Sequence, residues 1–287
     1  MAKNFKIGVM VESFRSGLRG GLDAAASLGA DGVQIYASAG ETEYSKMGSV
    51  QRRELLGLLK DRNLELSALC ADFGGQGFQV ESENPGRIEK SRHVMEMACE
   101  LGCRVLTTHI GVIPPDSKHP RYLVMAKACE KLGHYAKESG IVLAIETGPE
   151  PASVLRSFLD DISMPGALGV NFDPANLVMV CREDIPSAVE KLGPYIAHTH
   201  AKDGLNLKPV DAEVLYGSFS GEVFPDFSCQ DYIRETPLGE GGVPFKEYLA
   251  ALRKSGFAGY LTIEREVGES PQRDIELAVN FLRKLIL

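Results

Sequence analysis

The sequence lacks several features that would assign it to a particular class of protein. It has no hydrophobic run of membrane-spanning length, and its first residues show neither the apolar core nor the cleavage site of a signal peptide. Its six cysteines include no CxxC pair. We therefore expect a cytoplasmic protein with reduced, mostly buried thiols, and we expect Cys99 and Cys103 to pack inward from one helix. The cysteines stand at positions 70, 99, 103, 129, 181 and 229.

Basic residues are scarce relative to acidic ones. The chain carries 31 lysines and arginines against 39 aspartates and glutamates, a formal net charge of −8, with no block of like charges. Binding to nucleic acids or to acidic membranes depends on clustered lysine and arginine side chains. We therefore expect neither as a partner, and expect a small molecule instead.

The overall composition is typical of a globular protein, with 44% hydrophobic and 24% charged residues. A length of 287 residues fits two average domains, but it also fits one barrel of alternating strands and helices. One pattern recurs along the chain: a helical stretch closes on glycine and an apolar strand follows. These glycines predict helix C-caps at Gly29, Gly102, Gly140 and Gly256.

The predicted strands are near-continuous apolar runs, which indicates a parallel sheet covered on both faces. They fall at residues 5–11, 32–36, 64–70, 104–109, 141–146, 167–173, 195–200 and 260–264. The predicted helices fall at residues 19–29, 49–62, 85–101, 119–139, 150–162, 184–193, 244–255 and 271–286. This alternation predicts a single (β/α)8 TIM barrel over residues 1–287. An open doubly wound sheet is the alternative, disfavoured because no glycine-rich phosphate fingerprint follows the first strand.

One connection is much longer than the others. Residues 204–242, after the seventh predicted strand, form a loop rich in glycine, proline, serine and aromatic residues. A connection of this length in a compact domain is usually functional, and this one leaves the end of a barrel strand where active sites lie. We predict either a lid over the site or a contact between subunits of a homo-oligomer.

Four predicted strands end on side chains that can bind a metal: Glu146, Asp173, His200 and Glu264. A single carboxylate after a strand is more often a surface or helix-cap group, so the argument depends on four occurring in one barrel. Because the C-terminal ends of barrel strands meet at one face, we predict that these residues form a divalent-cation site. Such an oxygen-rich donor set suits Mn²⁺, Mg²⁺ or Co²⁺ better than a structural zinc.

The alternation of side chains along a strand separates rim positions from deeper ones. His198 and Asn171 share the parity of His200 and Asp173 but lie one layer lower, which predicts packed partners of the metal ligands. Polar residues at the rim and on the long loop are candidates for contacting a substrate. They are His109, Glu150, Asn176, Lys202, Arg234 and Glu266.

At these residues the chain resembles the xylose isomerase-like TIM-barrel superfamily of sugar isomerases, epimerases and dehydratases, which also includes endonuclease IV. The segments that carry the resemblance are IETGPE, NFDPAN, HTHAKD, PLGEGGVPF and LTIERE. In members like D-tagatose 3-epimerase, four such residues bind one divalent metal and two glutamates transfer protons. The resemblance implies one divalent cation (Mn²⁺, Mg²⁺, Co²⁺ or Zn²⁺) on the four residues above, with Glu146 and Glu264 as the catalytic pair.

Two departures from the family pattern are visible. The epimerases carry Asp-x-x-His after the sixth strand, where this chain has Asp173-Pro-Ala-Asn176, so the resemblance does not specify the sugar. Endonuclease IV binds three zinc ions through further histidines, and the second and third predicted strands supply none. Together with the acidic charge, this absence excludes the nuclease.

The resemblance implies a metal-dependent sugar or sugar-phosphate isomerase or epimerase. It would abstract a proton next to a carbonyl and pass through an enediolate that the cation stabilises. With the same residues, a dehydratase would expel a hydroxyl group from a keto-sugar or an inosose, as inosose dehydratase does. A barrel that binds a sugar without converting it is an alternative from another class.

Overall fold

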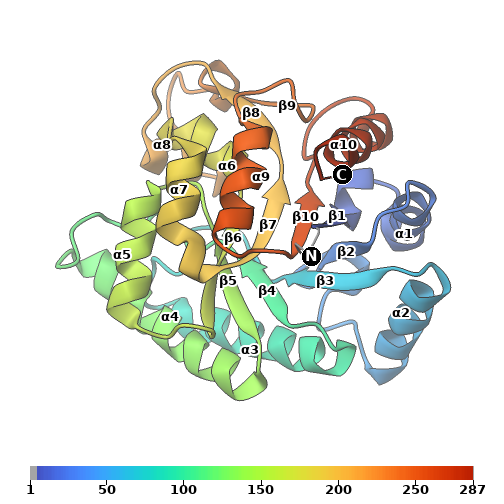
Figure 1. The fold of residues 1–287 in the computed structure, drawn as a ribbon. Helices are drawn as coiled ribbons and strands as arrows, with labels where there is room; N and C mark the ends of the chain where they lie inside the picture. Colours follow the sequence, from blue (N-terminus) through green and yellow to red (C-terminus); the bar gives the residue numbers. More distant parts are fainter. Residues whose placement is uncertain (1–4, 287) are drawn as a thin grey trace.

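The structure, a computed structural model, describes residues 5–286. In it, parallel strands form a closed barrel in the order β1-β10-β7-β6-β5-β4-β3-β2 (Figure 1). The barrel strands are β1 (Lys6–Met10), β2 (Gly32–Tyr36), β3 (Glu65–Cys70), β4 (Val105–Thr108), β5 (Val142–Glu146), β6 (Leu168–Phe172), β7 (Ile196–Ala201) and β10 (Tyr260–Ile263). The predicted (β/α)8 TIM barrel is confirmed, and every predicted strand end lies within one residue of the observed one.

Helices form a ring around this barrel (Figure 1). They are α1 (Gly17–Ser27), α2 (Ser49–Asp61), α3 (Asn84–Leu101), α4 (Pro120–Ser139), α5 (Ala152–Ile162), α7 (Ile185–Leu192), α9 (Phe245–Lys254) and α10 (Pro271–Ile286). After β6 the chain also forms the single turn α6 (Pro174–Asn176) and a π-helical turn (Leu177–Cys181). Shorter 3-10 turns occupy Val11–Phe14, Gly40–Thr42, Gly193–Tyr195 and Cys229–Asp231.

Helix ends and buried helix faces follow the sequence pattern. Gly102 and Gly140 cap α3 and α4 with φ angles of 70° and 65°, a conformation that favours glycine. The apolar residues of α9 that recur at helical spacing are all buried: Phe245, Tyr248, Leu249 and Leu252. Tyr248 stacks on Phe172 of β6 with ring centroids 5.5 Å apart, which fastens α9 to the barrel.

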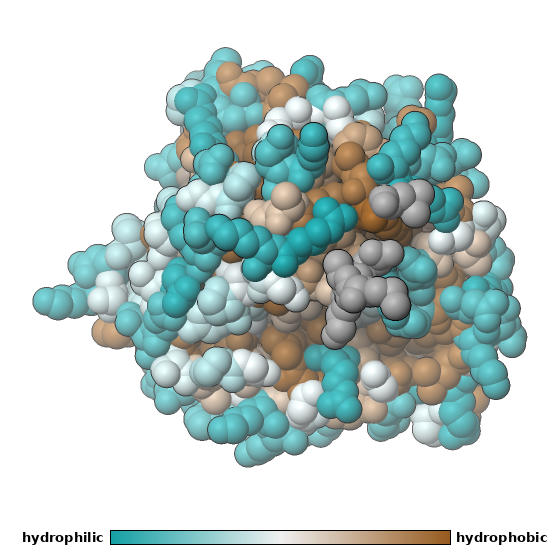
Figure 2. Space-filling model, viewed as in Figure 1, coloured by the Kyte–Doolittle hydropathy of each residue, from teal (hydrophilic) through white to brown (hydrophobic). Residues whose placement is uncertain are grey.

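The surface is polar at its edges, and the apolar residues gather inside. Figure 2 shows hydrophilic residues along most of the outline of this face and hydrophobic ones toward its middle. Within residues 5–286, none of the helices is both long and apolar enough to span a lipid bilayer. Cys70, Cys103 and Cys129 are buried as expected, but Cys99 is exposed. The prediction for Cys99 is wrong because the buried face of α3 runs through Val94, Ala98 and Leu101, and Cys99 lies off that face. Cys103 lies beyond the end of the helix and is buried independently of it.

The long connection after β7 is folded, in contrast to the loop that the sequence predicted. We call residues 203–242 the excursion. Within it, β8 (Asp203–Asn206) and β9 (Ile233–Thr236) pair as antiparallel strands, and α8 (Ala212–Phe219) lies between them in sequence. Figure 1 shows these elements at the end of the barrel toward which β7 points. The excursion contacts the loop after β3, where Gln76 donates to Glu222 at 2.7 Å and Ser220 donates to the carbonyl of Gly75 at 2.8 Å.

Candidate metal centre

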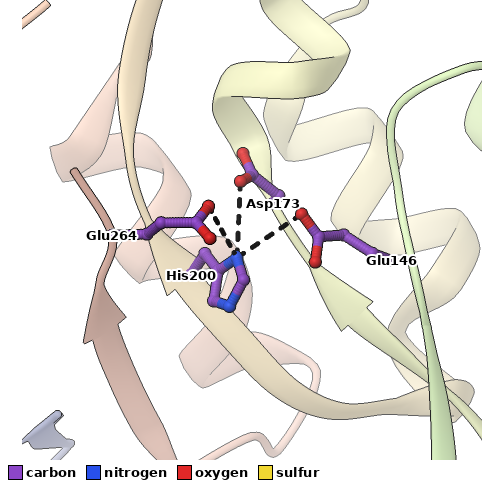
Figure 3. Close-up of side chains that lie close together, drawn as sticks. All are labelled: Glu146, Asp173, His200 and Glu264. Carbon is purple, nitrogen blue, oxygen red and sulfur yellow. Dashed lines mark ion pairs between the residues drawn. The ribbon is translucent and has the colours of Figure 1, made fainter. Parts of the chain in front are cut away.

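Four side chains converge at the C-terminal ends of adjacent barrel strands. Glu146 is the last residue of β5, Asp173 follows β6, His200 lies in β7 and Glu264 follows β10. His200 Nδ1 lies 3.5 Å from Glu146 Oε1, 3.5 Å from Asp173 Oδ2 and 3.3 Å from Glu264 Oε2. Figure 3 shows the carboxylates arranged around this nitrogen, with Glu146 and Glu264 on opposite sides. In the part of the chain that the structure describes, this is the one cluster with metal-ligand spacing.

The donor atoms of this cluster fit a bound cation. Asp173 and His200 are fully buried, and neither Asp173 Oδ2 nor His200 Nδ1 has a hydrogen-bond partner. A buried polar atom without a partner costs about 1–3 kcal/mol. Both atoms face the centre of the cluster, so a divalent cation held by three carboxylates and one imidazole nitrogen would satisfy both.

Gln34 of β2 orients the imidazole of His200. The Oε1 atom of Gln34 lies 3.1 Å from His200 Nε2, while its Nε2 atom donates to Thr107 at 3.0 Å. Because an amide oxygen only accepts hydrogen bonds, the neutral imidazole carries its proton on Nε2. Its Nδ1 lone pair is then directed at the carboxylates, as a metal ligand requires.

The electrostatics of the cluster favour a positive charge at its centre. Burial would lower the pKa of His200, but the charges of Glu264 and Glu146 raise it well above its usual value. Burial would also raise the pKa of Glu264, and the charges of Lys202 and His200 bring it below its ordinary range instead. Without a cation, a proton on His200 therefore supplies the positive charge that the carboxylates require.

Two amide side chains that contact the cluster, those of Gln34 and Asn171, lie where the pairing of the strands is irregular. The register of β2 with β3 shifts at Gln34, and that of β6 with β7 shifts at Asn171. Asn171 Nδ2 donates to Glu146 at 3.0 Å, and its Oδ1 lies 2.9 Å from His198 Nδ1. Burial and the neighbouring His200 hold the pKa of His198 well below its usual value, so His198 is neutral. The extra residues at these shifts, Ser67 and Ala197, belong to the partner strands β3 and β7. Gln34 and Asn171 themselves lie in regular strands and reach the predicted ligands from β2 and β6.

A second amide, from Asn176, holds the other oxygen of Glu146. Asn176 Nδ2 lies 3.1 Å from Glu146 Oε1 and 3.2 Å from the carbonyl of Thr147. Asn176 occupies the position at which the epimerases described above carry a histidine. In this chain the residue is an amide that lies in the cavity wall and orients the carboxylate of Glu146.

Lys202 is a buried cation beside the cluster. Its Nζ atom lies 3.0 Å from Glu264 Oε2 and 3.9 Å from Glu235, and it also pairs with Glu266. Burial would lower the pKa of Lys202, but these carboxylates raise it well above its usual value. Glu235 is shared with Arg265, whose Nη1 lies 2.6 Å away. The ammonium of Lys202 is therefore charged, and it fixes the carboxylate of Glu264.

His109, the residue after β4, pairs with Asp72. Its Nδ1 lies 3.0 Å from Asp72 Oδ2, and its Nε2 lies 3.5 Å from Glu146 Oε1. Burial would lower the pKa of His109, but Glu146 and Asp72 raise it to about 10. An imidazolium therefore faces Glu146 from the cavity wall at neutral pH.

The cluster opens into a cavity of about 1100 Å³. Among the predicted substrate contacts, the structure brings five to its wall: His109, Asn176, Lys202, Arg234 and Glu266. Glu150 does not lie in the wall. Its side chain is buried and accepts a hydrogen bond from the backbone N–H of Ile113 at 3.2 Å, and burial raises its pKa to about 8.

Three polar residues of this site were not among those predicted from the sequence: Gln34, Glu235 and Asp72. Gln34 lies within a strand, where a polar residue carries no positional signal. Glu235 lies in β9, an element that the sequence did not predict. Asp72 was detectable, because it follows β3 much as the predicted ligands end or follow their own strands.

A closed parallel barrel with a carboxylate–histidine centre at its strand ends defines a class of TIM-barrel proteins. The chain belongs to the xylose isomerase-like TIM barrel family, whose model matches residues 22–285. A solved xylose isomerase domain protein from Planctomyces limnophilus has a TM-score of 0.79 and 24% identity, covering 99% of this chain and 98% of its own.

Two other solved structures carry functional names. A D-tagatose 3-epimerase-like protein has a TM-score of 0.73 and 21% identity, covering 98% of each chain. The probable 3-DHS dehydratase AsbF from Bacillus anthracis has a TM-score of 0.73 and 18% identity, covering 97% of this chain and 99% of its own. At these sequence identities the structural similarity shows that the proteins share a fold, and it shows nothing further about function. A comparison with curated proteins gave no match.

Proposed function

We propose that the protein is a metal-dependent sugar isomerase or epimerase that moves a proton next to a carbonyl group. The observation that supports this is the position of Glu146 and Glu264 on opposite sides of a buried centre that fits a divalent cation. A divalent cation there would polarise a carbonyl and offset the negative charge that develops when a neighbouring proton leaves. Glu146, Asp173, His200 and Glu264 would hold it.

Glu146 and Glu264 are the acid/base pair of this proposal. One carboxylate removes a proton from the carbon next to the carbonyl, which leaves an enediolate. The other returns a proton to the opposite face of that carbon, giving an epimer, or to the adjacent carbon, giving an isomer. The amides of Asn171 and Asn176 hold Glu146, and Lys202 holds Glu264, so both bases are fixed before substrate arrives.

The charges around the cavity favour a sugar without a phosphate. In the described part of the chain, the cations of the wall are His109, Arg121, Lys202 and Arg234. His109 is already paired with Asp72 and faces Glu146. Arg121 is paired with Glu213, and Lys202 is surrounded by carboxylates. A phosphate would find Arg234 alone, whereas phosphate sites usually combine several charged donors. The amide of Asn176 and the carboxylate of Glu266 would instead contact sugar hydroxyls.

A dehydratase is the second candidate, and the position of His109 favours it. The imidazole of His109 lies 3.0 Å from Asp72 and faces the cavity, where its protonated form could protonate a departing hydroxyl. Glu146 or Glu264 would remove the proton, and loss of the hydroxyl from the adjacent carbon would give a double bond and water. The products separate the two candidates.

Proton exchange tests the proposal whatever the final product. The Mn²⁺-loaded protein is incubated in deuterium oxide with a panel of ketoses, aldoses and inososes, and the sugars are followed by nuclear magnetic resonance. We expect deuterium at the carbon next to the carbonyl. Glu146→Gln and Glu264→Gln should slow exchange roughly 10²–10⁴-fold, the range for an acid/base residue.

The control is Glu276→Gln, the same chemical change at an exposed position of α10. Wild-type rates in both site variants with the metal still bound would contradict the two-carboxylate mechanism. Sugar binding without exchange for any sugar would indicate a binding protein. Loss of a hydroxyl from the product would identify the dehydratase.

A further inference from the structure

The cavity is larger than a single sugar ring requires. Its volume is about 1100 Å³, whereas pockets that enclose drug-sized ligands have about 300–1,000 Å³. A free monosaccharide is smaller than such ligands. If its reacting carbons lie against Glu146 and Glu264, most of the cavity remains beyond the ring.

The cavity has two parts of different chemistry. The inner part is the buried, charged centre, where Glu146 and Glu264 are each 7% exposed. The outer part is bounded by the excursion and by the loops after β3, β4 and β10, and it carries six apolar side chains, of which Val112 alone is buried. They are Val112, Val214, Phe219, Phe224, Ile233 and Val267. Phe219 and Val267 keep 59% and 49% of their surface exposed.

Several polar side chains of the outer part already form hydrogen bonds or ion pairs with protein groups. Gln76 donates to Glu222 at 2.7 Å, and Arg121 pairs with Glu213. Gln79 donates to the carbonyl of Gln76 at 3.0 Å and accepts from the backbone N–H of Val112 at 3.3 Å. These contacts already use part of the hydrogen-bonding capacity that a second sugar would need. The apolar faces are what the outer part offers to a ligand.

Tyr216 marks the boundary between the two parts. Its ring lies 6.4 Å from that of His109 on the inner side and packs edge-on against Phe219 at 5.7 Å on the outer side. A ligand that spans both parts therefore passes from charged groups to aromatic ones. Aromatic side chains prefer edge-on or offset contacts with other aromatic rings.

We propose that the outer part binds an aromatic aglycone, so that the substrate is a glycoside whose ring bears a carbonyl at a carbon other than the anomeric one, and not a free sugar. This inference rests on the proposed function, because it assigns the sugar ring of the same substrate to the inner part. The sugar ring lies at the carboxylate–histidine centre, and the aglycone lies between the excursion and the loop after β10. The aglycone covers apolar surface that water otherwise contacts, including that of Phe219 and Val267.

Binding, measured without turnover, tests the inference. The Mn²⁺-loaded protein is titrated by calorimetry with nitrophenyl glucoside and with methyl glucoside, which differ in the aglycone. Burying an aromatic ring should tighten binding of the nitrophenyl glucoside by about 10- to 100-fold. Equal affinity for the two glucosides would overturn the inference.

Two variants locate the aglycone. Phe219→Ala and Val267→Ala, from separate parts of the chain, should each remove part of the preference for the nitrophenyl glucoside and leave methyl glucoside binding unchanged. Val223→Ala is the matched control, because Val223 lies in the same excursion, is 91% exposed and does not line the cavity. A preference that survives both site variants, or that falls equally in the control, would contradict the assignment.

The outcome is separable from that of the proposed function. The exchange experiment therefore also includes keto-glycosides, which carry a carbonyl in the ring and an aglycone. If the nitrophenyl preference is found and neither a free sugar nor a keto-glycoside exchanges deuterium, the outer site stands and the proposed chemistry fails. If a free ketose exchanges deuterium and the aglycone adds no affinity, the chemistry stands and this inference fails.

Discussion

At the scale of residues, Asp173 caps the helical turn α6 with one carboxylate oxygen and faces the candidate metal centre with the other. Its Oδ1 accepts the N–H of Asn176 at 3.0 Å and caps α6, while its Oδ2 has no partner. We predict that Asp173→Asn weakens Mn²⁺ binding by about 100-fold or more, since even outer partners of metal ligands cost about 10–100-fold. The amide of asparagine keeps the oxygen that caps α6 and replaces the oxygen that would bind the cation with an NH2 group. Calorimetric titration measures the affinity, and unchanged affinity would exclude Asp173 as a ligand.

Glu150 leads to a prediction about pH. Its pKa is about 8 in the folded protein against an ordinary value of 4.5, and burial is the first cause. As the pH rises from 4.5 toward 8, the unfolded chain loses this proton while the folded chain retains it, so Glu150 lowers stability over that interval. The size is about 1.4 kcal/mol per pKa unit.

Glu150→Gln removes this titration and keeps an acceptor for the N–H of Ile113. Urea unfolding at several pH values should show the wild-type losing stability relative to the variant between about pH 5 and pH 8. Parallel stability curves for the two proteins over this interval would show that Glu150 is ionised when folded.

The residues of the centre differ in how far the sequence could predict them. Glu146, Asp173, His200 and Glu264 lie at the ends of apolar strands, so alternation along each strand indicates which side chains point inward. Gln34 gives no such signal, because it lies within β2 and not at its end, and it reaches His200 from another strand of the barrel. A contact of this kind depends on how the strands are arranged, and no local pattern reports it.

At the scale of elements, the apolar pattern of the sequence predicts the strands and helices of the barrel, but it does not predict the elements of the excursion. The strands of the barrel are continuous apolar runs, and the outer helices carry one apolar stripe each, so a local pattern identifies both. β8 and β9 are short and half exposed, and many turn residues separate them. Their pairing is fixed by contacts that are distant in sequence, chiefly those of Asp203 at the base of the excursion.

Asp203 joins the two ends of the excursion. Its buried carboxylate accepts four backbone N–H groups at 2.9–3.0 Å, from Gly204, Gly239, Gly241 and Val243. We predict that Asp203→Asn speeds hydrogen exchange throughout residues 204–243 and leaves β3 and β4 unchanged. The variant turns one accepting oxygen into a donor that faces backbone donors, and each lost bond to a charged group costs about 1.5–3 kcal/mol.

Asp211→Asn is the control for this exchange experiment. Asp211 caps α8 by accepting from Glu213 N at 2.8 Å, and asparagine is an equally good cap. Its exchange pattern should match that of the wild-type protein. Equal protection of residues 233–243 in Asp203→Asn would mean that other contacts hold the excursion in place.

At the scale of the whole molecule, the candidate metal centre connects four neighbouring strands of the barrel. The strands that carry its four residues are adjacent in the order β10-β7-β6-β5. A cation held by all four would cross-link this side at the open end of the strands. Without a cation, three carboxylates share a small buried volume, and their charge is offset by the ammonium of Lys202, the imidazolium of His109 and a proton on His200.

We therefore predict that Mn²⁺ raises the unfolding temperature of the whole protein. At about 100 times its dissociation constant, a ligand specific for the folded state adds about 2.7 kcal/mol. For a chain of this size that corresponds to a rise of roughly 4–5 °C. Scanning calorimetry measures it, with the chelated protein as reference and potassium at equal ionic strength as the control for salt. In Asp173→Asn the rise should disappear; an equal rise in this variant would show that the stabilising cation binds elsewhere.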